Sequence, residues 1–193
     1  MSRNLCWGLL SALLVGAACH AARPAAIVSV RDAPASDAWW LRATLNPRSV
    51  VVRGLPVKRI APPWCAADEL SRETLGEGLL GMAGGTPLAD GQVFALSAAL
   101  DGSGRMQTAL VGAYRRCDGE RGLFVMIVEP VRERPRMRFL VELPEPGTAL
   151  AALSLAADGT LVAWWCNTAC DQGSRILYNR ETREFYVGGP AVR

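Results

Sequence analysis

Histidine is almost absent from this chain of 193 residues, since His20 is the only one. It lies beside an N-terminal apolar segment, so the folded part of the chain contains no histidine at all. This excludes serine and cysteine nucleophiles that a histidine activates, and most zinc catalysis. Acid–base work by two carboxylates stays open, but the spacing of the 18 acidic residues singles out no pair. We therefore expect a protein that is not an enzyme and has no cofactor.

Lysine is equally scarce, because Lys58 is the only lysine among 21 basic residues. The formal net charge of +3 is too small to indicate nucleic-acid binding. There is no long low-complexity tract, half of the residues are apolar and 20% are charged. These values are typical of a folded globular protein, and the length predicts one domain.

Long hydrophobic runs are also missing, apart from one between Leu5 and Ala18. That run is shorter than the roughly 20 apolar residues of a membrane-spanning helix. It follows the positive charge of Arg3 and ends in small residues, which is typical of an export signal. We therefore interpret residues 1–22 as an export signal and residues 23–193 as a single β-rich globular domain.

Two routes of signal cleavage are compatible with the sequence. The stretch Gly16-Ala17-Ala18-Cys19 resembles the lipobox of bacterial lipoproteins, in which the cysteine becomes the lipidated first residue. It departs from that pattern at Gly16, where a leucine-like residue is expected. Ordinary cleavage after Ala21 or Ala22 is the alternative. The first route implies a lipid anchor in the outer membrane, facing the periplasm, and the second a soluble periplasmic protein.

Both routes leave the same four cysteines in the folded domain, which in an exported protein predicts two disulfides. Of the three pairings we favour Cys65–Cys117 and Cys166–Cys170. Loop-closure entropy gives about 4 kcal/mol for the long loop and about 2 kcal/mol for the short one. One alternative is a four-cysteine zinc site, which the oxidising compartment and the lack of a Cys-x2-Cys motif disfavour. The other is a redox-active Cys166/Cys170 pair, which is disfavoured because no helix start or βαβ context lowers a thiol pKa there.

Strand patterns dominate the rest of the chain. Residues 136–143 alternate, with Met137, Phe139, Val141 and Leu143 on one face, which is the period of a half-buried strand. Further strands are expected over residues 39–45, 49–53, 57–60, 93–100, 106–116, 123–129, 150–156, 160–166, 175–178 and 184–187. The sequence therefore predicts a mainly β fold, either an antiparallel sandwich or a curled, barrel-like sheet built from hairpins.

One short helix is expected near residues 66–80. Acidic residues near its start, at Asp68, Glu69 and Glu73, suit the positive end of a helix dipole. Gly76 and Gly78 weaken its second half.

The chain also contains an internal echo. Residues 95–102 read Ala-Leu-Ser-Ala-Ala-Leu-Asp-Gly, and residues 152–159 read Ala-Leu-Ser-Leu-Ala-Ala-Asp-Gly. Both segments run on through a strand to a Cys-Asp pair. Two halves that are both β-meanders would explain the echo, and so would chance, since alanine- and leucine-rich hairpins are common.

Arginines provide the main candidate binding surface. In an extended strand alternate residues share a face, so four arginines would line one side of the segment 132–138. With Arg115 they form a predicted docking surface for an acidic protein, an anionic glycan or lipid headgroups: Arg132, Arg134, Arg136, Arg138 and Arg115. The alternative is a solvated edge, where charges prevent strand-to-strand aggregation.

Trp164 and Trp165 are adjacent in a predicted strand, so they point to opposite faces. One of them is expected in the core, and the other is a candidate binding anchor.

Together these features predict an exported protein of the bacterial envelope that binds a macromolecular partner without catalysis. An acidic protein or an anionic glycan is favoured, with an inhibitor or protective partner of a secreted enzyme as one form of this function. A membrane would be contacted only through the N-terminal lipid. The alternatives are a structural or assembly lipoprotein of the envelope, and a carboxylate-based hydrolase.

Overall fold

The computed structural model describes residues 28–30, 40, 43–76, 88–131, 134–144, 150–166 and 171–191. The predicted export signal, with Cys19, lies outside these residues. The described chain is mainly β, which confirms the predicted fold class, and it forms a sandwich rather than a closed barrel. None of the described helices has the length and apolar character that crossing a bilayer requires.

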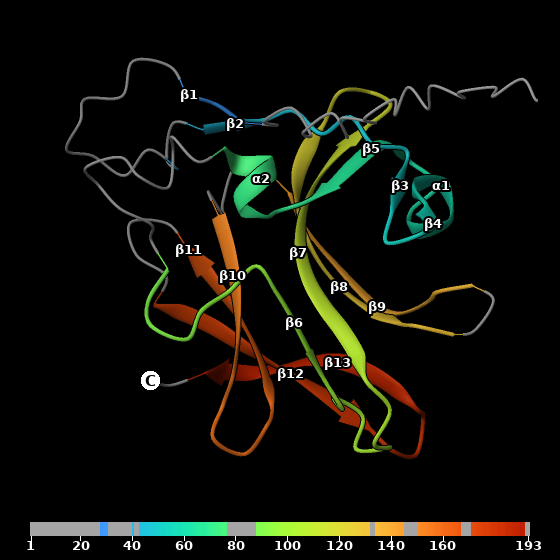
Figure 1. Cartoon of the computed structure of the whole chain (residues 1–193), viewed down its shortest axis with the longest axis vertical. Coiled ribbons are helices and arrows are strands. Elements are labelled where there is room, and N and C mark those ends of the chain that lie inside the picture. Colours follow the sequence, from blue (N-terminus) through green and yellow to red (C-terminus); the bar gives the residue numbers. More distant parts are fainter. Residues whose placement is uncertain are drawn as a thin grey trace, which may run out of the picture.

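Two antiparallel sheets build the sandwich (Figure 1). The five-stranded sheet runs β5-β7-β8-β9, with β6 also paired to β7. Its strands are β5 (Trp64–Glu69), β6 (Ala95–Ala98), β7 (Gln107–Arg116), β8 (Arg121–Glu129) and β9 (Arg136–Pro144). The four-stranded sheet runs β10-β11-β12-β13, with β10 (Leu150–Leu155), β11 (Leu161–Cys166), β12 (Gln172–Asn179) and β13 (Glu184–Ala191).

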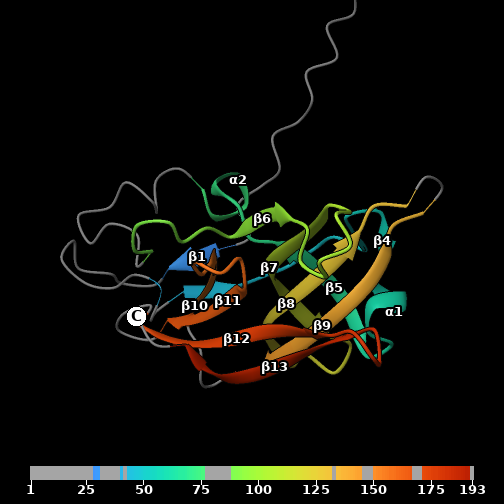
Figure 2. The same cartoon turned by 90° about the horizontal axis from the view of Figure 1, so that it is seen from below.

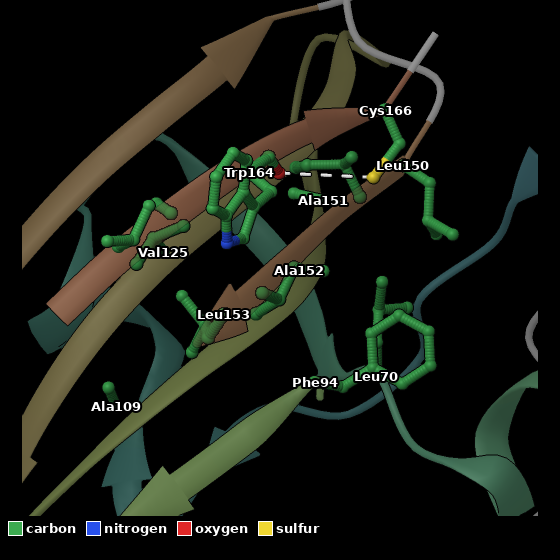
Figure 3. Close-up of a cluster of buried hydrophobic side chains, with 14 of the residues drawn as sticks. Leu70, Phe94, Ala109, Val125, Leu150, Ala151, Ala152, Leu153, Trp164 and Cys166 are labelled. Atoms are coloured by element: carbon green, nitrogen blue, oxygen red, sulfur yellow. Dashed lines mark hydrogen bonds between the residues drawn. The ribbon is translucent and has the colours of Figure 1, made fainter. Parts of the chain in front are cut away.

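The main core lies between these sheets (Figure 3). Every second residue of β8 (Leu123, Val125 and Ile127) faces it, as the period of two requires. At one corner Val93 and Leu153 exchange two backbone hydrogen bonds, of 2.8 and 2.7 Å. At the other corner β13 lies beside β9 (Figure 2).

A second core covers the opposite face of the five-stranded sheet. It is roofed by β3 (Val51–Val52), β4 (Leu55–Pro56) and α1 (Val57–Ile60). Inside it the ring of Trp64 stacks on Tyr114, with centroids 4.5 Å apart and planes within 3°. A separate hairpin pairs β1 (Val28–Val30) with β2 (Ala43–Leu45).

The predicted disulfide Cys65–Cys117 is confirmed, with Cα atoms 4.9 Å apart. It joins the start of β5 to the turn after β7. Cys166 is buried and also disulfide-bonded. Its predicted partner Cys170 lies outside the described residues, so the pairing Cys166–Cys170 stays a prediction.

The prediction of a helix near residues 66–80 is wrong in its first part. Residues 64–69 form β5, because Trp64, Ala66 and Ala67 are buried and the segment completes the sheet beside β7. The helix is the single turn α2 (Arg72–Leu75), which Ser71 caps and Gly76 ends at a φ of +87°. The rest of the predicted helix, from residue 77, lies outside the described residues.

Two strand predictions also need correction. Residues 57–60 form α1 rather than a strand, and this places Val57 and Ile60, three positions apart, on one buried face. In β9 a bulge at Arg138 shifts the register. Met137 therefore packs against the second core, whereas Phe139 and the predicted residues after it pack against the main core.

Candidate functional site

A polar hollow of about 430 Å³ lies between the turn that follows β6 and the turn that follows β10. Two Asp-Gly turns face each other across it, at 101–102 and at 158–159. Strand β12 and the hairpin turn after it supply Tyr178 and Arg180, and β13 supplies Tyr186. We call this feature the turn hollow.

Local sequence fixes the geometry of both turns. The carboxylates of Asp101 and Asp158 each accept the backbone N–H of the residue two positions later, Ser103 and Thr160, at 2.9 Å. The glycine after each aspartate has a positive φ, of +70° and +79°, which other residues rarely adopt. The walls of the hollow are therefore rigid turns.

Hydrogen bonds and nearby arginines stabilise the ionised form of both carboxylates. The hydrogen bond from the backbone of Thr160, helped by Arg175, lowers the pKa of Asp158 to about 2. Burial opposes ionisation of Asp101, but hydrogen bonds with Ser103 and Gln107 and the charge of Arg138 give a net lowering of its pKa. Neither aspartate is thus a suitable general acid near neutral pH.

Arg180 supplies the unbalanced charge of the turn hollow. It is exposed and makes no ion pair with any residue that the structure describes. One guanidinium nitrogen, Nη2, lies 3.5 Å from the position that a Cβ on Gly102 would occupy. The cation therefore lies against the first Asp-Gly turn, where it can meet an anionic ligand group.

An ion network links the end of β8 and the start of β9 to the turns at 101–105 and 180–183. Arg138 Nη1 donates to Glu129 Oε2 at 2.6 Å, and Arg105 Nη1 lies 2.8 Å from Glu129 Oε1. Arg138 also lies 3.9 Å from Asp101 Oδ2 and donates to the backbone carbonyl of Arg183. The hydrogen bond to Glu129 raises the pKa of Arg138. This network is structural, because its charges satisfy one another.

A second hollow, the Trp164 groove, lies on the other side of the Asp158 turn and has a volume of about 380 Å³. Trp164 Nε1 donates to Ser154 Oγ at 2.8 Å. Gly173 makes room for the indole, since a Cβ there would lie 2.7 Å from the ring. Leu155, which is 44% exposed, and Arg175 also line the groove.

The structure separates the two predicted anchor tryptophans. Trp164 is a buried member of the main core and also lines the groove, while Trp165 is half-buried against the same core. Their side chains leave opposite faces of β11, because they are adjacent in one strand.

Only part of the predicted line of arginines can be placed, and Arg138 departs from it. Arg138 is buried in the ion network, Arg134 and Arg136 are exposed at the start of β9, and Arg132 lies outside the described residues. Arg115 lies opposite Arg121 in the register of β7 and β8, at the start of β8. Arg136 lies opposite Glu129 at the other end of β8. The rise along the strand puts these two ends about 26 Å apart. The bulge in β9 is the reason that Arg138 leaves the line.

The internal echo is the sequence signal that marks the turn hollow. The internal echo places Asp-Gly at the end of each repeated segment, and these two turns meet in the structure. No sequence pattern marks Arg180 and Tyr186 as residues of the turn hollow, because only the curl of the four-stranded sheet brings them to it.

The described residues contain no group of three histidine, cysteine, aspartate or glutamate side chains that could hold a metal ion. Comparisons with protein-family models, with curated proteins and with solved structures give no match for this chain.

Proposed function

We propose that this chain is an exported protein of the bacterial envelope that binds an acidic protein partner without catalysis. The observation that carries the proposal is the pair of hollows on either side of the Asp158 turn, both built on rigid strands and turns. We call the Asp158 turn together with the two hollows beside it the turn surface. It replaces the arginine line as the proposed docking site.

The side chains of the turn surface are of the types that dominate binding energy at protein interfaces. Trp164, Tyr186 and Arg180 belong to the three residue types most enriched among such hot spots. Tyr186 on β13 is 47% exposed, which leaves apolar area for a partner to bury. Since the backbone is held by Asx turns and strand pairing, docking costs little conformational entropy.

The charge of Arg180 supports an acidic partner. The acid groups of the turn surface already have cations, so a ligand carboxylate would meet the Arg180 guanidinium, which has no ion pair among the described residues. Arginine binds carboxylates in a bidentate geometry, which gives orientation as well as affinity.

Export is supported by the Cys65–Cys117 disulfide, because such crosslinks persist in oxidising compartments. Residues 1–22 supply the proposed signal, with either lipidation at Cys19 or cleavage after Ala21 or Ala22. The protein is thus proposed to be periplasmic, either soluble or anchored in the outer membrane by lipid.

Affinity capture from envelope extract, followed by titration of the purified captured protein, tests the proposal. We expect one stoichiometric acidic protein, with R180E and L155E each weakening its binding at least tenfold. R180E reverses the charge that faces the ligand carboxylate, and L155E places a carboxylate on the exposed apolar wall of the Trp164 groove, where it repels an acidic partner. Binding should also weaken between 50 and 500 mM salt, because the ion pairs are exposed.

R136E is the matched control, since Arg136 is an exposed arginine at the start of β9, away from the turn hollow's lining residues. It should leave binding within twofold. If R136E abolishes binding and R180E does not, the docking surface is at the start of β9 instead. Capture of an anionic glycan, or hydrolysis of one by the purified domain, would contradict the proposal.

A further inference from the structure

The only lysine of the chain lies on a disulfide. Lys58 Nζ is 3.0 Å from Cys117 Sγ and donates to the backbone carbonyl of Pro62 at 2.9 Å. Lys58 belongs to α1, which follows β4, whereas Cys117 begins the turn between β7 and β8. The contact is therefore brought about by the fold and not by the local sequence.

The two sulfurs of this disulfide have different surroundings. Cys117 is exposed, while Cys65 is half-buried in β5 beside the fully buried Trp64. The backbone N–H of Cys117 donates to Pro63 at 3.0 Å, which holds the turn against the end of the α1 segment. An attacking group from solvent thus reaches Cys117 first.

The charged group in contact with Cys117 Sγ favours anionic sulfur. Of the two carboxylates in the turn, Asp118 accepts the backbone N–H of Glu120, and Glu120 pairs with Arg116 at 2.7 Å. The ammonium of Lys58 is the charged group in contact with Cys117 Sγ. A partly exposed sulfur beside a cation is the setting in which cysteines react, whereas buried cysteines in apolar surroundings are inert.

We propose that Cys65–Cys117 is a thiol–disulfide exchange site, at which an external dithiol attacks Cys117 Sγ. This site is independent of the turn surface. Its partner is a dithiol reductant, either a small molecule or the two-cysteine site of an oxidoreductase.

The exchange proceeds in two balanced steps. A thiolate of the reductant bonds to Cys117 Sγ, the Cys65–Cys117 bond breaks, and Cys65 departs with the electron pair and takes a proton from water. The second thiolate of the reductant then attacks the reductant sulfur that is bonded to Cys117, and the bond between that sulfur and Cys117 Sγ breaks. Cys117 leaves as a thiolate beside the Lys58 ammonium, so the cation assists both the approach of the first thiolate and the departure of Cys117. The domain gains two electrons, and the dithiol is oxidised to a disulfide.

Reduction of the full mature domain by dithiothreitol at pH 7 in 20 mM salt, with acid quenching, alkylation and peptide mass mapping, measures this reaction. We expect K58M to slow reduction of Cys65–Cys117 about fivefold, the effect of one unit charge at contact distance in water. K58R should restore most of the rate. The difference between K58M and the native chain should vanish in 1 M salt.

R59M is the matched control, because Arg59 is exposed on the same helical turn. It should leave the rate within twofold. An unchanged rate in K58M at low salt would overturn the proposal. So would glutathione, used as a monothiol probe on the native chain, if it formed its mixed disulfide with Cys65 rather than Cys117. Equal thermal midpoints of the oxidised variants confirm that charge, not loss of structure, changes the rate.

Discussion

Arginine residues show how a single position departs from a sequence pattern. The spacing of the segment 132–138 places its arginines on one face, and exposed Arg134 and Arg136 obey the expectation of a solvated strand edge. Arg138 does not, since the bulge turns it toward Glu129, whose side chain is only 6% exposed. A bulge has no signature in residue spacing, so the burial of Arg138 could not be predicted.

The buried Arg138–Glu129 pair leads to a stability prediction. R138M should lower the free energy of unfolding by about 3 kcal/mol, because it leaves the buried Glu129 charge poorly compensated. Arg105 still reaches Glu129, which keeps the loss near the lower end of the range. Urea denaturation measures the change.

Two further variants complete this test. R136M, at an exposed arginine two positions earlier, should change stability by less than about 0.5 kcal/mol. The double change R138M/E129M should recover most of the loss, since no charge is then left buried. Equal losses in the single and double variants would show that packing, rather than charge, governs the site.

Among the elements, the longer strands bounded by turn signals were predicted, whereas β5 and α1 were not. β7, β8, β10 and β11 lie close to their predicted bounds, because both their composition and their turns point to strands. Residues 64–69 contain alanine and acidic residues, which suit a helix locally. Pairing with β7 and burial of Trp64 override that preference, and neither is visible in a local window.

Close packing within β7 makes Gly112 a sensitive position. A Cβ there would lie 2.2 Å from the ring of Phe124 on the neighbouring strand, and 2.6 Å from the backbone oxygen of Asp68. G112A should therefore cost about 3 kcal/mol, since neither the buried ring nor the backbone can give way. Thermal and urea unfolding measure the loss.

Gly189 in β13 is the matched control for this change. It also lies in a strand, but nothing would lie within 4 Å of an added Cβ. G189A should leave stability within about 0.5 kcal/mol of the native value. A loss in G189A comparable with that in G112A would mean that the glycine backbone itself, and not the Phe124 contact, is required.

At the scale of the whole molecule, the two halves of the sandwich begin alike. β6 to β9 and β10 to β13 are both four-stranded antiparallel meanders. Each starts with a segment of the internal echo and turns at an Asp-Gly whose aspartate accepts a backbone N–H two residues on. The first turn is longer, since Ser97 pairs with Thr108 whereas Ser154 pairs with Val162. The meander interpretation of the echo therefore agrees with the topology, and the turn hollow lies where the two first turns meet.

The Cys65–Cys117 disulfide joins two cysteines with a sequence separation of 52. The double change C65S/C117S should lower the free energy of unfolding by about 4 kcal/mol, the loop-closure entropy released in the unfolded chain. Urea denaturation of oxidised native chain and variant measures it, and a larger denaturant slope is expected as the unfolded chain expands.

Packing in the second core determines whether the C65S/C117S variant unfolds in one transition or in two. Trp64, next to Cys65, stacks on Tyr114 and contacts Phe124, so β5 is held to β7 by packing as well as by sulfur. The variant should therefore unfold in one cooperative transition at lower urea, with near-ultraviolet signals of Trp64 intact before it. Two separate transitions would contradict this, because they would mean that the α1 and β5 layer is attached to the sandwich by the disulfide alone. In that case reductive exchange at Cys117 would detach the α1 and β5 layer from the sandwich, rather than only lower the stability of the domain.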